Sequence, residues 1–297
     1  MSVPLAYLVV VLIWSTTPLA IKWSGEEVGF LFAVTARMAL ALVLSLFIVT
    51  LLRKKLPWHK DAIKVYLAIG LSLYCTMLVV YWSAQFLPSG FISVLFGLTP
   101  FFTGLMAALW LKEKSFTPFR IIGMLVGFSG LFIIFGQGLN VGPHTAYGIA
   151  GILLGVFLHS ASTVLIKKIN TELPVFTANT GGLSIAVVLY FISWLAMGGR
   201  LPLVVPQYTA ASIVYLGSIG SVVGAVLFYY ALRHLEASKM ALLTVITPVT
   251  ALMIGQIFNH EPVSQNTVIG TSLILFGLIL YQWADEWLKT LKRLSIE

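Results

Sequence analysis

One long apolar segment occurs twice in this chain, and the repetition restricts the folds that the chain can adopt. The first copy, LFGLTPFFTGLMAALWLKE, spans residues 95–113, and the second, LTVITPVTALMIGQIFNHE, spans residues 243–261. The Thr-Pro pair and the final glutamate, Glu113 or Glu261, match at a constant shift of 148 residues. Each copy is long and apolar enough to cross a bilayer. A membrane-spanning segment that occurs twice in the sequence indicates a membrane protein built from two copies of one unit.

Composition supports this interpretation and excludes a water-soluble domain. Hydrophobic residues make up 59% of the 297 residues and charged residues only 9%, which leaves too few polar side chains to cover a soluble surface. The net charge of +8 comes from short basic clusters between apolar runs, which predicts contact with lipid headgroups and no nucleic-acid partner. The only cysteine is Cys75, so no intramolecular disulfide is possible.

Ten stretches approach the length of roughly 20 apolar residues that a bilayer-spanning helix needs. We therefore predict an all-α integral membrane protein with ten transmembrane helices. These are expected at about residues 5–22, 29–52, 63–85, 88–111, 118–136, 145–168, 174–197, 209–233, 236–258 and 264–284.

The positions of lysine and arginine predict the orientation. With both termini in the cytoplasm, fifteen of the eighteen basic residues fall on the cytoplasmic side and only Lys22 and Arg200 on the other, with Arg37 inside a helix. Such a bias is typical of multi-pass proteins with cytoplasmic termini. The expected location is the cell inner (cytoplasmic) membrane.

Ten helices in two copies give five helices per repeat, and an odd number forces the second copy to enter the membrane upside down. We expect one inverted repeat at residues 1–138, the other at 139–284, and a cytoplasmic amphipathic tail at 285–297. This arrangement puts Glu113 and Glu261 at opposite faces of the membrane.

Both glutamates are expected to be structural. Thr117 and Ser264 can cap the helices that follow, while a carboxylate at a helix C-terminus opposes the helix dipole. Each glutamate is therefore predicted to accept hydrogen bonds from backbone amides at the start of the next helix, although a role in transport stays open.

Catalytic chemistry has little support in the sequence. No Asp or Glu lies in a predicted helix interior, and of the five histidines only His159 is central. No HExxH motif, paired carboxylate or Cys/His cluster occurs. We expect no enzymatic activity, metal or cofactor, and any ion coupling must do without a membrane-embedded carboxylate.

Polar and aromatic residues recur on single faces of six predicted helices. A shift of 145 residues sets Trp14 on His159, and a shift of 148 sets Tyr81 on Tyr229. We predict a central cavity, although small polar residues at such spacing also serve close helix packing. Its lining would be Trp14, Thr17, Tyr74, Tyr81, Phe96, Thr99, His159, Ser162, Thr163, Tyr229, Thr244 and Thr247.

Three further residues stand out inside the predicted helices. Arg37 is a full charge at membrane depth and needs partners, so it is either a structural anchor or a contact for the substrate. Pro100 and Pro248 each remove an intrahelical hydrogen bond near mid-membrane, and we predict that they act as hinges.

The segments Tyr81-Trp82-Ser83-Ala84 and LxxLTPFFTxLxAxLxLKE, repeated as Tyr229-Tyr230-Ala231-Leu232 and LTVITPVTALMIGQIFNHE, resemble the EamA-type exporters of the drug/metabolite transporter superfamily. The resemblance covers nearly the whole chain. It implies two inverted five-helix repeats, a pocket bounded by helices 1, 3, 4, 6, 8 and 9, and an arginine in helix 2, as Arg37 is.

The resemblance also implies a function, which is export of small metabolites such as amino acids by alternating access. A passive facilitator or channel, or a translocator of lipid-linked substrates, remains the alternative on the same fold. The expected partners are a small-molecule substrate and membrane lipids, and the expected state is a monomer or weak dimer.

Overall fold

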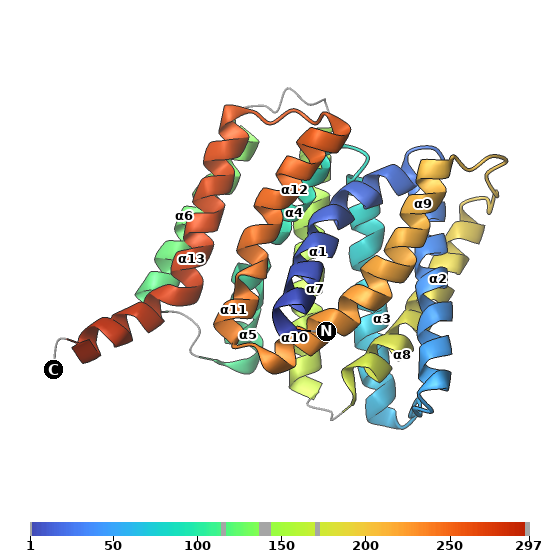
Figure 1. The fold of residues 1–297 in the computed structure, drawn as a ribbon, viewed down its shortest axis with the longest axis horizontal. Coiled ribbons are helices and arrows are strands. Elements are labelled where there is room, and N and C mark those ends of the chain that lie inside the picture. Colours follow the sequence, from blue (N-terminus) through green and yellow to red (C-terminus); the bar gives the residue numbers. More distant parts are fainter. Residues whose placement is uncertain (1, 114–116, 137–143, 170–172, 295–297) are drawn as a thin grey trace.

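The structure is a computed structural model, and it describes residues 2–113, 117–136, 144–169 and 173–294. In these ranges every regular element is a helix (Figure 1). The first repeat contains α1 (Val3–Gly25), α2 (Phe30–Leu51), α3 (Lys60–Ser83), α4 (Ser89–Phe96), α5 (Thr99–Leu111) and α6 (Pro118–Gly136). The second contains α7 (Thr145–Ile169), α8 (Val175–Ala196), α9 (Gln207–Tyr215), η1 (Leu216–Val223), α10 (Gly224–His234), α11 (Ala237–Ala241), α12 (Leu243–Asn259) and α13 (Gln265–Leu294).

The all-α membrane fold is confirmed. Within the described ranges, nine helical spans are long and apolar enough to cross a membrane, and Pro118–Ile134 is a shorter apolar helix at the place of the predicted fifth span. Large apolar side chains such as Leu8 and Leu12 are more than half exposed, which suits a surface that faces lipid. The predicted amphipathic tail falls on residues whose side chains, from 284 to 297, lie outside the described part of the structure.

Three of the predicted spans are interrupted in ways that the sequence did not indicate. The fourth span divides into α4 and α5, and the ninth divides into α11 and α12. Pro100 lies in the first turn of α5, where its missing N–H leaves no hydrogen bond unmade. The expectation that Pro100 removes an intrahelical hydrogen bond is therefore wrong, whereas Pro248 does lie inside α12. The eighth span contains a π-helical segment, η1, between α9 and α10.

The repeated sequence ends in the same turn in both copies. Lys112 and His260 both adopt the left-handed conformation, with φ of 55° and 50°. The next residue in each case, Glu113 or Glu261, donates its backbone N–H to a carbonyl six residues earlier, at 3.4 Å and 3.2 Å. The left-handed residue also donates its N–H to that same carbonyl in both copies, and this shared helix end supports the equivalence of the two copies.

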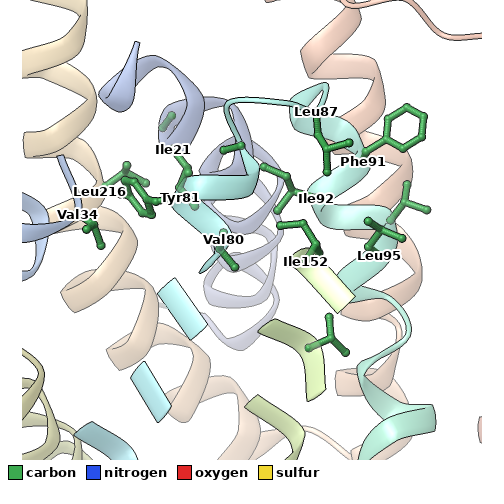
Figure 2. Packing of buried hydrophobic residues seen from close by; sticks show 14 of the residues in the cluster. Ile21, Val34, Val80, Tyr81, Leu87, Phe91, Ile92, Leu95, Ile152 and Leu216 are labelled. Atoms are coloured by element: carbon green, nitrogen blue, oxygen red, sulfur yellow. The ribbon is translucent and has the colours of Figure 1, made fainter. Parts of the chain in front are cut away.

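The two repeats are interlocked. Helix α1 packs against α9, α10 and α12 of the second repeat, while α7 packs against α3 and α5 of the first. Helices α6 and α13 pair at one edge of the bundle (Figure 1). A continuous apolar core joins both repeats and includes Val34, Tyr81, Leu95, Ile152 and Leu216 (Figure 2).

Candidate functional site between the repeats

Glu261 holds one end of the bundle together. Its Oε2 accepts hydrogen bonds from Ser89 Oγ at 2.9 Å and Gly90 N at 3.4 Å, and its Oε1 accepts from Asn259 Nδ2 at 2.8 Å and Lys22 Nζ at 3.4 Å. The side chain of Glu261 is only 6% exposed. These residues, Lys22, Ser89, Gly90, Asn259 and Glu261, define what we call the Glu261 end.

The helix that Glu261 caps is α4 of the other repeat, not the following helix α13, so the sequence-based prediction is wrong about the partner. Helix α13 is capped by Ser264, whose Oγ accepts from Thr267 N at 3.1 Å. Thr117 likewise caps α6, with its Oγ1 accepting from Arg120 N at 3.3 Å. Both of these caps were predicted from the sequence. Because Ser264 already accepts a hydrogen bond from a backbone N–H at the start of α13, Glu261 is available to bind α4.

The carboxyl of Glu261 is held in its ionised form. Burial alone raises the pKa of Glu261, but hydrogen bonds from Ser89 and Asn259 and the nearby Lys22 ammonium outweigh burial, so the pKa lies below its ordinary value. An ionised carboxylate that accepts four hydrogen bonds is a strong cross-link between α1, α4 and the end of α12.

Close backbone contact completes the closure of the Glu261 end. A Cβ atom on Gly90 would lie 2.7 Å from the Leu252 side chain, so α4 and α12 can approach this closely only because residue 90 is glycine. Trp23 Nε1 donates to Asn259 Oδ1 at 3.0 Å, and the hydroxyls of Ser15 and Thr250 are hydrogen-bonded to each other. Helices α1, α4 and α12 therefore leave little space at this end.

The opposite end of the bundle is open. Lys167 Nζ donates to Glu113 Oε1 at 2.7 Å, but these side chains are 63% and 40% exposed. We call this the Glu113 end. A cavity of about 350 Å³ opens beside the pair. Its lining comes from α5, α6, α7, α13 and the turn after α5, and comprises Pro100, Thr103, Gly104, Ala107, Glu113, Arg120, Thr163, Val164, Lys167 and Tyr281.

His159 faces the interior of the bundle and is nevertheless exposed. Leu154 and Leu165 mark the outer face of α7, and at about 100° per residue His159 lies about 140° away from Leu154. His159 and Thr163 are both exposed on this inner face, whereas Ile152 on the same face is buried. Thr163, one turn further along this face, lines the cavity at the Glu113 end.

Trp14 occupies the equivalent inner face of α1. Its ring stacks on Phe228 of α10 with centroids 4.9 Å apart, and the Phe228 ring contacts Tyr229 edge-on at 5.5 Å. Trp14, Phe228 and Tyr229 are all half-buried. Phe228 was not among the predicted site residues, because only the packing of α1 on α10 shows that it meets Trp14.

Several predicted site residues make hydrogen bonds within the bundle. The Tyr74 hydroxyl is hydrogen-bonded to Ser193 Oγ of α8 at 2.5 Å, and Ser162 Oγ donates to the Ala68 carbonyl of α3 at 3.1 Å. Thr247 is buried. The hydroxyls of the five predicted threonines donate to carbonyls of their own helix or of the preceding turn: Thr17 to Ile13, Thr99 to Phe96, Thr163 to His159, Thr244 to Ala241 and Thr247 to Leu243. Phe96 is half-buried against the main core.

Arg37 is buried between α2, α3 and η1. Its Nη1 donates to the Tyr81 hydroxyl at 3.3 Å and its Nε donates to Ser221 Oγ at 3.3 Å, and the guanidinium lies 5.9 Å from the Tyr81 ring centroid. The Ser221 hydroxyl in turn donates to the Leu216 carbonyl within the π-helical turn at 2.8 Å. Tyr81 is 1% exposed, so it contacts Arg37 in the core and not in an open pocket.

Metal-ligand side chains are sparse in the described ranges, where no group of three His, Cys, Asp or Glu residues could hold an ion.

Several proteins similar to this chain are named as transporters, exporters or efflux pumps. A "Probable amino-acid metabolite efflux pump" of Escherichia coli is 23% identical over 96% of both chains. A "Probable terminal-alkyne amino-acid exporter" of Streptantibioticus cattleyicolor is 25% identical over 93% of this chain and 91% of the relative. An "Uncharacterized transporter" of Archaeoglobus fulgidus is 28% identical over 90% and 94%.

A crystal structure with 19% identity shares the fold, with a TM-score of 0.64 over 97% of this chain and 98% of that one. The EamA-like transporter family matches twice, at residues 1–136 and 146–282. These two matches cover nearly the whole chain and correspond to the two repeats. The chain therefore belongs to the EamA-like transporter family and is a multi-pass membrane transporter.

Proposed function

We propose that this transporter exports small amphipathic or zwitterionic metabolites, amino acids above all, by alternating access around a pocket between its two repeats. The observation that carries this proposal is the difference between the two ends. The Glu261 end is closed by buried hydrogen bonds, and the Glu113 end is open beside an exposed ion pair. Such an asymmetry between equivalent halves is what an inverted-repeat transporter adopts in one of its two conformations.

The distribution of basic residues supports a cytoplasmic location for the Glu113 end, and with it cytoplasmic termini in an inner membrane. On this orientation the described conformation is open to the cytoplasm, where an exporter collects its substrate. Pro100 at the α4–α5 break and Pro248 within α12 are proposed hinges.

The chemistry of the inner faces favours a small ligand with an apolar body. Trp14, Phe228 and Tyr229 offer aromatic surface, which holds apolar groups and cations. His159 adds a ring nitrogen that can bind a polar end. We propose that these residues, with Thr17, Thr99, Thr163 and Thr244, bind the substrate, and that Arg37, Tyr74, Tyr81, Phe96, Ser162 and Thr247 act mainly by positioning the helices.

The relatives support the substrate class, because two of them are named as exporters of amino acids or their metabolites. The test is a metabolite-efflux profile of cells that express the chain, the His159→Ala variant or the Leu154→Ala variant. Leu154 lies on the outer face of the same helix and is 48% exposed, so its variant is a matched control. We expect amino acids to leave cells faster with the parental chain and with Leu154→Ala, and not with His159→Ala. Equal profiles for all three would refute the proposal.

A passive facilitator is the second candidate, and one observation favours it. The only Asp or Glu within the apolar spans of the described structure is Asp61, which lies in the first turn of α3 with its side chain 61% exposed. The usual titrating group of a proton-coupled carrier is therefore lacking deeper in these spans. Transport into vesicles with and without an imposed proton gradient separates the two candidates, since only a coupled exporter concentrates its substrate.

A further inference from the structure

Two ion pairs in the structure are equivalent by sequence although they lie at opposite ends of the bundle. A shift of 145 residues converts Lys22 into Lys167, and a shift of 148 converts Glu113 into Glu261. The Lys22–Glu261 pair joins the first helix of repeat one to the fourth span of repeat two. The Lys167–Glu113 pair joins the first helix of repeat two to the fourth span of repeat one.

The two pairs have different surroundings. In the Lys22–Glu261 pair the lysine and glutamate side chains are 24% and 6% exposed, against 63% and 40% in the Lys167–Glu113 pair. Glu261 also receives hydrogen bonds from Ser89 and Gly90 at the start of α4. The residues equivalent to these two, at the same shift of 148, are Ala237 and Ser238 at the start of α11.

The structure shows no hydrogen bond from the described backbone of α11 to Glu113 in this conformation. Among the described residues, the only hydrogen-bond donor shown for the Glu113 carboxylate is Lys167, and the cavity of about 350 Å³ lies beside it. Burial strengthens an ion pair that keeps its hydrogen bonds, while an exposed pair is weak. The Glu261 carboxylate therefore binds both its lysine and the start of α4, whereas among the described residues Glu113 binds only its lysine.

We propose that the two pairs are alternating gates, which rests on the alternating-access function proposed above. In the described conformation the Glu261 gate is closed and the Glu113 gate is open. In the opposite conformation Glu113 accepts hydrogen bonds from the start of α11, as Glu261 does from α4, and the Glu261 cluster separates. The contacts that one gate gains offset those that the other loses, so neither conformation is strongly favoured.

One residue difference indicates which gate closes more tightly. Gly255 leaves room for the Glu261 carboxylate, because a Cβ atom there would lie 2.4 Å from Oε2. The equivalent residue at the Glu113 end is Ala107, which has that Cβ atom. The Glu113 gate is therefore the looser one when closed, and the resting conformation is the one described, open at the Glu113 end.

Two cysteine reporters at equivalent positions test the proposal in purified protein without any substrate. Thr103 lines the cavity at the Glu113 end, and Ala251, its equivalent at the shift of 148, is 2% exposed. Thr103→Cys and Ala251→Cys, each in a Cys75→Ser background, are labelled with a maleimide. We expect fast labelling at residue 103 and slow labelling at residue 251.

Gate variants should move the two reporters in opposite directions. Glu261→Gln should speed labelling at residue 251 about tenfold, a shift of about 1.4 kcal/mol, and slow it at residue 103. Glu113→Gln should do the reverse. Asp61→Asn, which removes an exposed pair with Lys64, is the matched control and should change neither rate. Lys22→Gln repeats the test of the Glu261 gate if Glu261→Gln fails to fold.

Labelling rates that change in opposite directions at the two positions would support the gates even if no amino acid is transported. The test of the gates is therefore independent of the substrate assignment. Labelling that changes in the same direction at both positions would indicate general loosening of the fold and would overturn the proposal. Labelling rates that do not change in the gate variants would overturn it as well.

Discussion

Replacing Gly255 with alanine distinguishes the effect of tertiary contacts from that of helix propensity, because the two predict changes of opposite sign in the free energy of unfolding. Gly255 lies inside α12, where Gly→Ala alone stabilises a helix by about 1 kcal/mol. The new Cβ atom, however, would lie 2.4 Å from Glu261 Oε2 and 2.9 Å from Ser89 Oγ. Both distances are too short, so the carboxylate must move away from Ser89 and Gly90.

The magnitude follows from the hydrogen bonds at risk. A hydrogen bond to a charged group contributes about 1.5–3 kcal/mol, and Glu261 is too buried for water to replace its donors freely. Loss of one bond, less the helix gain, leaves a net destabilisation of about 0.5–2 kcal/mol, and loss of both leaves about 2–5 kcal/mol.

Thermal unfolding of the purified protein in detergent measures the effect. Gly255→Ala should unfold at a lower temperature than the parent, while Gly25→Ala, where the nearest atom to the new Cβ would be 3.5 Å away, should not. In a Glu261→Ala background the Gly255→Ala change should destabilise less, because the nearer of the two clashing groups, the carboxylate, is gone. A Gly255→Ala protein as stable as the parent would refute the packing described at the Glu261 end.

Three other predictions concern the pocket, the buried arginine and pH. Trp14→Ala and His159→Ala should each impair transport in vesicles while the unfolding temperature stays near the parental value; parental rates, or loss through unfolding alone, would mean that these residues only pack. Arg37→Ala should lower the unfolding temperature as well as the transport rate, because it leaves the Tyr81 and Ser221 hydroxyls without their donor at a cost of about 1–3 kcal/mol each. The exposed control Arg200→Ala should change neither quantity. Loss of transport by Arg37→Ala at an unchanged unfolding temperature would make Arg37 a substrate contact. Because the folded pKa of Glu261 is depressed below its ordinary value of 4.5, its stabilisation is full above that pH and is lost as pH falls through the folded pKa. Unfolding temperatures of the parent measured from about pH 7 down to pH 3 should fall below pH 4.5 by more than those of Glu261→Gln, and parallel curves would contradict the ion pair.

Local features were predictable from the sequence. The repeat, the all-α membrane fold and the caps Thr117 and Ser264 each depend on a few neighbouring residues, and hydrophobic length is read directly from the chain. The repeated segment also marked Glu113 and Glu261 as equivalent before their shared helix end was seen.

Features that depend on packing between distant helices were not predictable. Glu261 finds its donors at Ser89 and Gly90, about 170 residues away along the chain, and nothing near either site marks the pairing. The π-helical turn η1 and the break before Thr99 likewise depend on neighbours that the periodicity does not report. Tyr74 showed the right spacing for a cavity face, yet its hydroxyl meets Ser193 of α8, because one helix face can contact either a cavity or another helix.

Amino-acid transport by the purified chain in proteoliposomes tests the central claim most directly. Vesicles preloaded with an unlabelled amino-acid mixture should accumulate radiolabelled amino acid by exchange when they contain the parental chain or Leu154→Ala, and should fail to do so with His159→Ala at equal protein content. Accumulation by His159→Ala at the parental rate, or no exchange of any amino acid by a well-folded parental protein, would contradict the account.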